Sequence, residues 1–134
     1  MYCDYVTLKN QLKITIMENQ IEKNLVHIHE LLAKGGFIEA METYLHDDVE
    51  LKEANGDPKK GKAFCIKFED DFIKNDLKEF IGYEVGNYAV QGNNSFYEAV
   101  MTLKLNDGST MVSEQVVATE WKDGKIYKER YYHA

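Results

Sequence analysis

The sequence contains few of the residues that stabilise small specialised scaffolds. Its 134 residues include one proline and two cysteines, Cys3 and Cys65, with no Cys-x-x-Cys pair. This composition excludes a disulfide framework or a collagenous repeat as the main source of stability. The two cysteines could form a single disulfide, but free thiols in a reducing cytoplasm are the preferred interpretation.

Long apolar runs are lacking as well. No stretch approaches the roughly 18 consecutive apolar residues that a membrane helix requires. Residues 1–20 carry scattered charges and no apolar core ahead of a cleavage site, so they do not resemble a secretory signal. We therefore expect a cytoplasmic protein without a membrane partner.

Basic residues are outnumbered, with 16 Lys and Arg against 23 Asp and Glu and a formal net charge of −7. Because nucleic acids and anionic membranes are bound by clustered Lys and Arg, neither partner is expected. The 44 % hydrophobic and 29 % charged residues are typical of a globular chain. Composition does not change along the sequence, which predicts one domain, residues 19–134, after an N-terminal extension, residues 1–18. Met17 is a candidate alternative translation start, which would place residues 1–16 outside the natural protein.

The first half of the chain shows helical periodicity, which predicts a helix over about residues 19–33. Its apolar stripe comprises Ile21, Leu25, Ile28 and Leu32. Gly35-Gly36 ends this helix, because glycine readily adopts the left-handed conformation that closes helices. A shorter helix, a strand over residues 49–54 and a helix over about residues 62–74 follow.

From Leu77 onward the apolar period becomes two, which predicts four long strands. They cover residues 77–91, 95–105, 110–122 and 125–133. Asp107-Gly108 and Asp123-Gly124 between alternating runs are strong hairpin signals. Helices first and then an antiparallel meander predict an α+β fold, with the helices packed on one face of a curled sheet.

The two Asp-Gly turns also predict which side chains share a face. If both are two-residue loops, Met101 lies opposite Glu114, and a one-residue slip would invert the assignment. The more apolar face, assigned to the helices, includes Tyr97, Ala99, Met101, Leu103, Glu114, Val116, Tyr127, Glu129 and Tyr131. The other face includes Phe96, Val100, Met111, Val117, Trp121 and Ile126. Exposed apolar area of this kind predicts a homodimer through the sheet face.

Two stretches resemble the nuclear-transport-factor-2-like (NTF2-like) superfamily. Residues 32–40 with 44–49 resemble its opening, and residues 121–126 with 129–132 resemble the ending of its SnoaL-like branch. The likeness covers roughly residues 19–133 and implies a cone, in which three N-terminal helices pack in the concavity of a strongly bent, mostly antiparallel sheet. It also implies a deep, mostly apolar pocket and dimerisation through the convex sheet face.

The superfamily includes ketosteroid isomerases, polyketide cyclases, epoxide hydrolases, dehydratases and binding modules without catalysis, so the fold alone selects no activity. Isomerase-like members have a carboxylate base at the end of the first strand, where Glu53 falls. Their tyrosine donor is replaced by His29, and their protonated aspartate has no counterpart, since the nearest predicted inward positions are Val116 and Ala118. Steroid isomerisation is therefore not expected. SnoaL-type cyclases use an acidic residue on the last strand, which Glu129 matches.

Carboxyl groups in an apolar pocket have raised pKa values that suit acid/base chemistry. Glu129, Glu53 and Glu114 are therefore the candidate catalytic groups, and His29 is a candidate donor or base. The alternatives are solvated surface glutamates and a histidine that is merely satisfied. Candidate ligand-binding residues, which could equally be core, are Tyr97, Met101, Tyr127, Tyr131, Phe64 and Phe68.

Together these observations predict a cofactor-independent pocket protein for a small apolar or polyketide-like molecule. If it is an enzyme, cyclisation, isomerisation, dehydration and hydrolysis all fit. No His and carboxylate cluster has zinc-like spacing, so no metal is expected. The alternative is a non-catalytic ligand-binding or dimerisation module.

Overall fold

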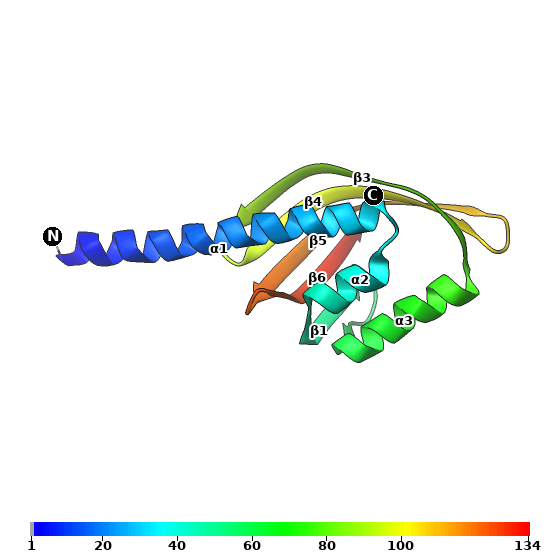
Figure 1. Cartoon of the computed structure of the whole chain (residues 1–134), viewed down its shortest axis with the longest axis horizontal. Helices are drawn as coiled ribbons and strands as arrows, with labels where there is room; N and C mark the ends of the chain where they lie inside the picture. Colours follow the sequence, from blue (N-terminus) through cyan, green and yellow to red (C-terminus); the bar gives the residue numbers. More distant parts are fainter. Residues whose placement is uncertain (1) are drawn as a thin grey trace.

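The computed structural model describes residues 2–134, with side chains from Tyr5 onward, and has three helices and six strands in that range (Figure 1). The helices are α1 (Tyr2–Ala33), α2 (Phe37–Tyr44) and α3 (Lys62–Asn75). The strands are β1 (Leu45–Glu53), β2 (Lys59–Lys60), β3 (Leu77–Gln91), β4 (Asn94–Leu105), β5 (Thr110–Lys122) and β6 (Lys125–His133). The predicted α+β class is confirmed.

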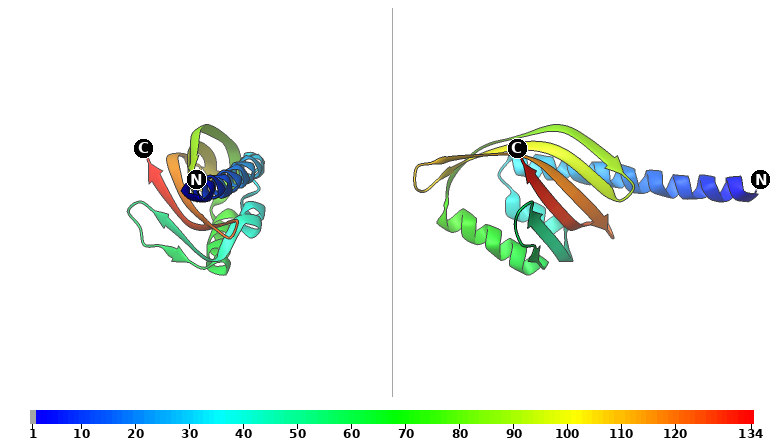
Figure 2. Two further views of the ribbon diagram at one scale, coloured as in Figure 1. Left: turned by 90° about the vertical axis from the view of Figure 1, so that its left-hand side faces the viewer. Right: turned by 180° about the vertical axis from the view of Figure 1, so that it is seen from behind.

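The six strands form one mixed sheet in the order β2-β1-β6-β5-β4-β3. β3 to β6 are consecutive antiparallel neighbours, and β1 joins β6 in parallel. Three register shifts interrupt the β3–β4 pairing, and irregularities of this kind bend a strand. Figure 2 shows the resulting curvature, with the helices on the concave side.

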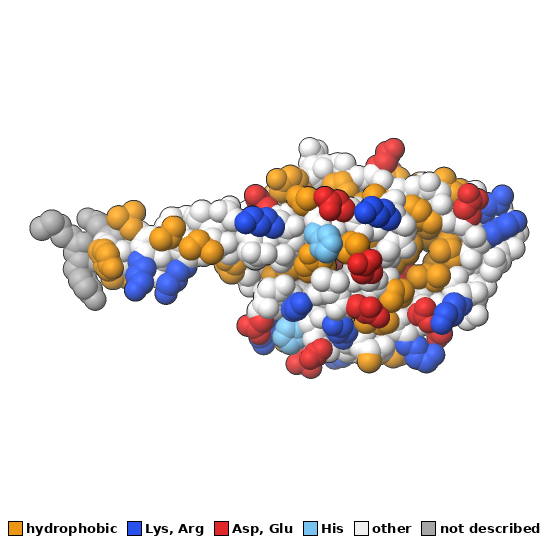
Figure 3. Space-filling view, in the orientation of Figure 1, with side chains coloured by type: hydrophobic (Ala, Val, Ile, Leu, Met, Phe, Trp, Pro, Cys, Tyr) orange, Lys and Arg blue, Asp and Glu red, His pale blue; other side chains and the backbone are white. Residues whose placement is uncertain are grey.

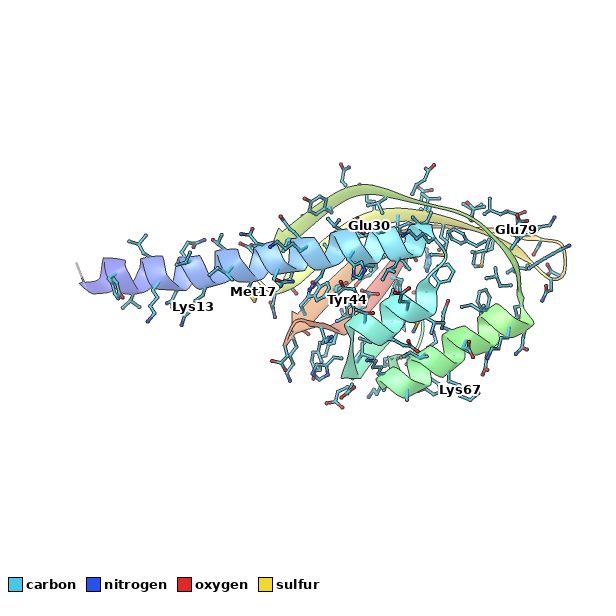
Figure 4. The ribbon with its side chains drawn as sticks, in the orientation of Figure 1. Lys13, Met17, Glu30, Tyr44, Lys67 and Glu79 are labelled. Carbon is cyan, nitrogen blue, oxygen red and sulfur yellow. The ribbon has the colours of Figure 1, made fainter. Side chains whose placement is uncertain are left out.

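α1 is longer than predicted, because it begins at Tyr2 instead of near residue 19. Its C-terminal half packs on the sheet, where Ile21, Leu25 and Ile28 are buried. Its N-terminal half projects beyond the sheet as a continuous helix, with Lys13 on the projecting part (Figures 1 and 4). We call residues 5–17 the α1 arm. None of the described helices combines the length and apolar character needed to cross a membrane.

The turn between β5 and β6 has the predicted geometry. Asp123 and Gly124 both have positive φ, 54° and 73°, as a two-residue type I′ turn requires. Lys122 accordingly pairs with Lys125.

The turn between β4 and β5 is one residue longer than predicted. Leu105 N donates to Ser109 O at 2.9 Å, Asp107 Oδ1 accepts from Ser109 N at 2.8 Å, and Gly108 has φ 92°. These features define a three-residue loop with a left-handed glycine. The predicted register across this hairpin is therefore wrong by one residue, and every side chain of β5 faces the opposite side from the prediction.

A bulge in β6 keeps the register error of β5 from reversing the end of β6. Trp121 pairs with Ile126, whereas Glu120 pairs with Lys128, which leaves Tyr127 as an extra residue. Beyond this bulge, β6 has the facing that was predicted, so the pocket candidates near its end still point toward the helices.

Most of the apolar residues predicted for the convex face lie in the core or on the concave side instead. Trp121, Val117 and Ile126 are buried in the core, with exposed fractions of 4 %, 1 % and 6 %. Met111 also faces the concave side, where it lines a pocket. Phe96 remains exposed on the convex face. The predicted composition of the dimer patch was therefore wrong, because it depended on the register of β5.

Candidate functional site

A pocket of about 340 Å³ lies between the three helices and the concave face of the sheet. This volume falls in the range of small-molecule sites. The helices contribute mainly apolar side chains to its wall: Leu32, Phe37, Met41, Phe68 and Phe72. The strands contribute Tyr97, Met101, Leu103, Met111, Glu129 and Tyr131, among others. In Figure 3 the body is hollowed on its right half, where hydrophobic side chains gather.

Glu129 is the buried carboxyl group of this wall, with an exposed fraction of 9 %. Its Oε2 accepts a hydrogen bond from Thr119 Oγ1 at 2.6 Å, and its Oε1 accepts one from Tyr131 Oη at 2.7 Å. Burial raises the pKa of Glu129, and these two hydrogen bonds oppose the rise. The result is a carboxyl held in one orientation and able to exchange a proton closer to neutral pH than an exposed glutamate.

Three tyrosines extend the polar part of the wall. Burial raises the pKa of Tyr97 and of Tyr131 well above the ordinary value, and the negative charge of Glu129 raises both further. Tyr83 hydrogen bonds with Tyr97, and burial raises the pKa of Tyr83 as well. All three phenols are therefore neutral hydroxyls that can donate hydrogen bonds.

His29 lies behind this row of tyrosines. Its Nδ1 is 3.0 Å from Tyr83 Oη, and its ring meets the Tyr97 ring edge-on with centroids 4.6 Å apart. Burial lowers the pKa of His29, which favours the neutral imidazole. His29 is consequently placed to orient Tyr83, and it is not among the residues that line the pocket.

A second set of polar groups lies where the wall reaches solvent. Glu53 lines the pocket and is exposed, and its Oε2 contacts His133 Nε2. Ser113 Oγ is 3.4 Å from His133 Nδ1. Glu53 therefore ends β1 near the pocket, as the resemblance implied, in a more solvated setting than Glu129.

Sequence reasoning did not single out Glu69, Lys59 or Tyr83, all of which line the pocket. Burial raises the pKa of Glu69, and Lys59 opposes that rise. Glu69 lies four residues after Cys65, so both are on one face of α3. That spacing was the available signal, and it was overlooked because the stripe of phenylalanines on the same helix was more prominent.

The structure brings together six of the ten predicted site residues at the pocket. These are Glu129, Glu53, Tyr97, Met101, Tyr131 and Phe68. Phe64 is 54 % exposed and Tyr127 packs against His46. Glu114 belongs to the convex face, because the longer β4–β5 turn reversed β5. The role of each residue in binding or catalysis stays a prediction.

Cys65 is a free, buried thiol whose pKa burial raises. The side chain of Cys3, the other half of the disulfide that the sequence left open, lies outside the described residues. Among the side chains that the structure describes, no group of three or more His, Cys, Asp or Glu is arranged to hold a metal ion.

Comparison with solved structures identifies the fold. A candidate SnoaL-like polyketide cyclase from Mesorhizobium loti is 25 % identical with a TM-score of 0.72, over 84 % of this chain and 98 % of its own. A candidate isomerase from Bacillus subtilis is 15 % identical with a TM-score of 0.66, over 88 % of each chain. An LEH-like epoxide hydrolase from Mycobacterium tuberculosis is 14 % identical with a TM-score of 0.69, over 91 % of this chain and 85 % of its own.

No protein-family model matches the sequence, and no curated protein is significantly similar to it. The structural likenesses nevertheless show an NTF2-like cone, and they confirm the resemblance to the SnoaL-like branch of that superfamily. The three neighbours are described by three different activities, so the fold does not specify one for this chain.

Proposed function

We propose that the protein binds a small, mostly apolar molecule in this pocket and that Glu129 transfers a proton to or from it. The observation that supports this proposal is the setting of the Glu129 carboxyl. It is buried in a pocket wall with apolar neighbours, and two hydroxyl donors hold its oxygens. A carboxyl with a raised pKa and a fixed orientation suits general acid/base catalysis.

The tyrosines would supply the second requirement, which is stabilisation of charge on a ligand oxygen. Tyr97 and Tyr83 are neutral phenols near the carboxyl in largely buried surroundings, and a ligand oxygen would accept a hydrogen bond in place of the one between them. Hydrogen bonds to a developing oxyanion are worth more in such surroundings than in water. Isomerisation, cyclisation, dehydration and hydrolysis all use a proton transfer beside an oxygen, and all remain within the proposal without a cofactor.

A binding module without catalysis is the second candidate. The observation that favours it is that Thr119 and Tyr131 already satisfy both Glu129 oxygens. A carboxylate oxygen can accept more than one hydrogen bond, so the contacts leave room for a ligand but do not require one.

A panel of aromatic ketones, enones and epoxides separates these candidates when each compound is scored for thermal shift and for turnover. We expect at least one compound to raise the melting temperature and to be converted. Glu129→Gln should keep the thermal shift but lower turnover at least about 100-fold, the range of a lost general acid or base. Tyr131→Phe should have a smaller effect on turnover, because the carboxyl remains.

Glu79→Gln is the matched control, since the same chemical change at an exposed position away from the pocket should alter neither readout. Thermal shifts without turnover would support the binding module. If no compound stabilises the parent protein, or if Glu129→Gln turns over a substrate at the parental rate, the proposed proton transfer is wrong.

A further inference from the structure

The α1 arm has an apolar side that the described structure leaves uncovered. Tyr5, Leu8, Leu12 and Ile16 recur at a spacing of three or four residues, so they form one stripe along the helix. Each is 60 % or more exposed. Figure 3 shows hydrophobic and basic side chains together on this projecting part. A long exposed apolar stripe is typical of an interaction surface.

The charges of the arm have one sign. Between Tyr5 and Met17 the only charged residues are Lys9 and Lys13, in a chain whose net charge is −7. They lie one helical turn apart, about 6 Å along the axis, beside the stripe. The arm is therefore an apolar surface bordered by positive charge, attached to an acidic body.

The convex face of the sheet carries a surface of the complementary kind. A groove of about 460 Å³ crosses β3, β4, β5 and the end of β6. Its apolar side chains on the convex face are Val100, Val116 and Tyr132, of which Val116 and Tyr132 are 40 % and 45 % exposed.

The residues that line this groove include three glutamates and the C-terminal residue, but no Lys or Arg. Glu84 and Glu114 both lie next to Val100 in register, one on each side of it. Glu98 lies two residues before Val100 on the same face of β4. Cross-strand neighbours at these positions are within about 10 Å of one another, a span that two flexible lysines can reach.

We propose that the α1 arm docks in the convex groove of a second copy of this chain. The apolar stripe would cover the valines and Tyr132, and Lys9 and Lys13 would face Glu84, Glu98 and Glu114. The arm cannot reach its own groove, because it continues the helix that packs on the concave side and projects away from the body (Figures 1 and 2). A second copy of the chain carries both the apolar, basic arm and the apolar, acidic groove, so each copy can dock its arm on the other.

A contact of sheet against sheet fits the charges less well. With the twofold axis through the groove, it would place the three glutamates of one groove near those of the other, and like charges facing each other across an interface are unfavourable. When the arm docks on the sheet, its lysines lie next to the glutamates of the groove, so opposite charges meet. Two such contacts related by a twofold axis close the assembly and double its area, which brings it nearer to the size of a stable interface.

Sedimentation velocity of the full chain tests the proposal by charge exchange. We expect a dimer of twice the 15.5 kDa chain mass. Lys9→Glu with Lys13→Glu should weaken dimerisation at least about tenfold, and Glu84→Lys with Glu114→Lys should do the same. An equimolar mixture of the two double variants should recover part of the lost association, because each arm then meets a groove of opposite charge.

The matched control is Lys34→Glu with Lys78→Glu, which makes the same charge change at exposed positions outside the arm and should leave the dimer intact. Circular dichroism establishes that each variant is folded. A monomeric parent at tens of micromolar would overturn the proposal. So would a dimer that survives both double variants, which would indicate sheet-against-sheet association, or a mixture that fails to recover association. Because the readout is mass, this outcome is independent of whether Glu129 is catalytic.

Discussion

The buried carboxyl of Glu129 makes the free energy of unfolding depend on pH. Burial raises its pKa above the ordinary 4.5. Between 4.5 and the raised value, the folded chain holds this proton more tightly than the unfolded chain does. The free energy of unfolding therefore falls as pH rises through that window, and the penalty is complete above the raised pKa.

Glu129→Gln removes this titration. We expect the unfolding free energy of the variant, relative to the parent, to be higher at about pH 8 than at about pH 4.5. Urea denaturation of both proteins at the two pH values measures the difference. An equal difference for Glu129→Gln at both pH values would mean that the carboxyl titrates as an exposed glutamate does.

At the scale of the element, the facing of β5 has the largest consequences. The structure buries Trp121, and its Nε1 donates to Ser95 Oγ at 2.8 Å. Ser95 is itself fully buried. The register expected from two identical Asp-Gly turns would instead expose this tryptophan, so its contribution to stability reports on the register.

Trp121→Ala should lower the unfolding free energy by about 3–5 kcal/mol, the cost of removing a large aromatic side chain from a core. Tyr88→Ala is the comparison, because Tyr88 is 57 % exposed and its loss should cost about 1 kcal/mol or less. Chemical denaturation measures both. A loss for Trp121→Ala that is as small as for Tyr88→Ala would mean that β5 has the opposite facing in solution.

At the scale of the whole molecule, the proposed docking of the α1 arm in the convex groove predicts that stability depends on protein concentration. If folding is linked to dimerisation, dilution favours unfolding. Raising the protein concentration about 100-fold should raise the melting temperature by several degrees in the parent. The Lys9→Glu and Lys13→Glu double variant should show a clearly smaller rise. Calorimetry at two concentrations tests this, and equal melting temperatures for the parent at both would contradict linkage.

Local patterns in the chain were enough to predict the order of the three helices and of every strand except the two-residue β2. The stripe from Ile21 to Leu32, the Gly35-Gly36 stop and the alternation after Leu77 depend only on neighbours in sequence, and each is present in the structure. The helical spacing of Tyr5, Leu8, Leu12 and Ile16 was the available signal for the arm. It was overlooked because residues 1–18 were treated as an extension to the domain.

The pocket was predicted only in part, because of one turn and one bulge. Tyr97 and Met101 face the helices because their strand has a simple alternation, and Glu129 and Tyr131 do so because a bulge at Tyr127 restores their facing. Glu114 does not, because Asp107 bonds to Ser109 and lengthens one loop.

Alternation along a strand thus follows from the sequence alone, since successive side chains must point to opposite faces. Which face becomes the inside depends on how adjacent strands pair. A turn or bulge of one residue sets that pairing, and its energy is settled by hydrogen bonds and core packing among residues distant in the chain. The carboxyl that the pocket surrounds was therefore visible in the sequence, whereas the partners that hold it became known only from the folded chain.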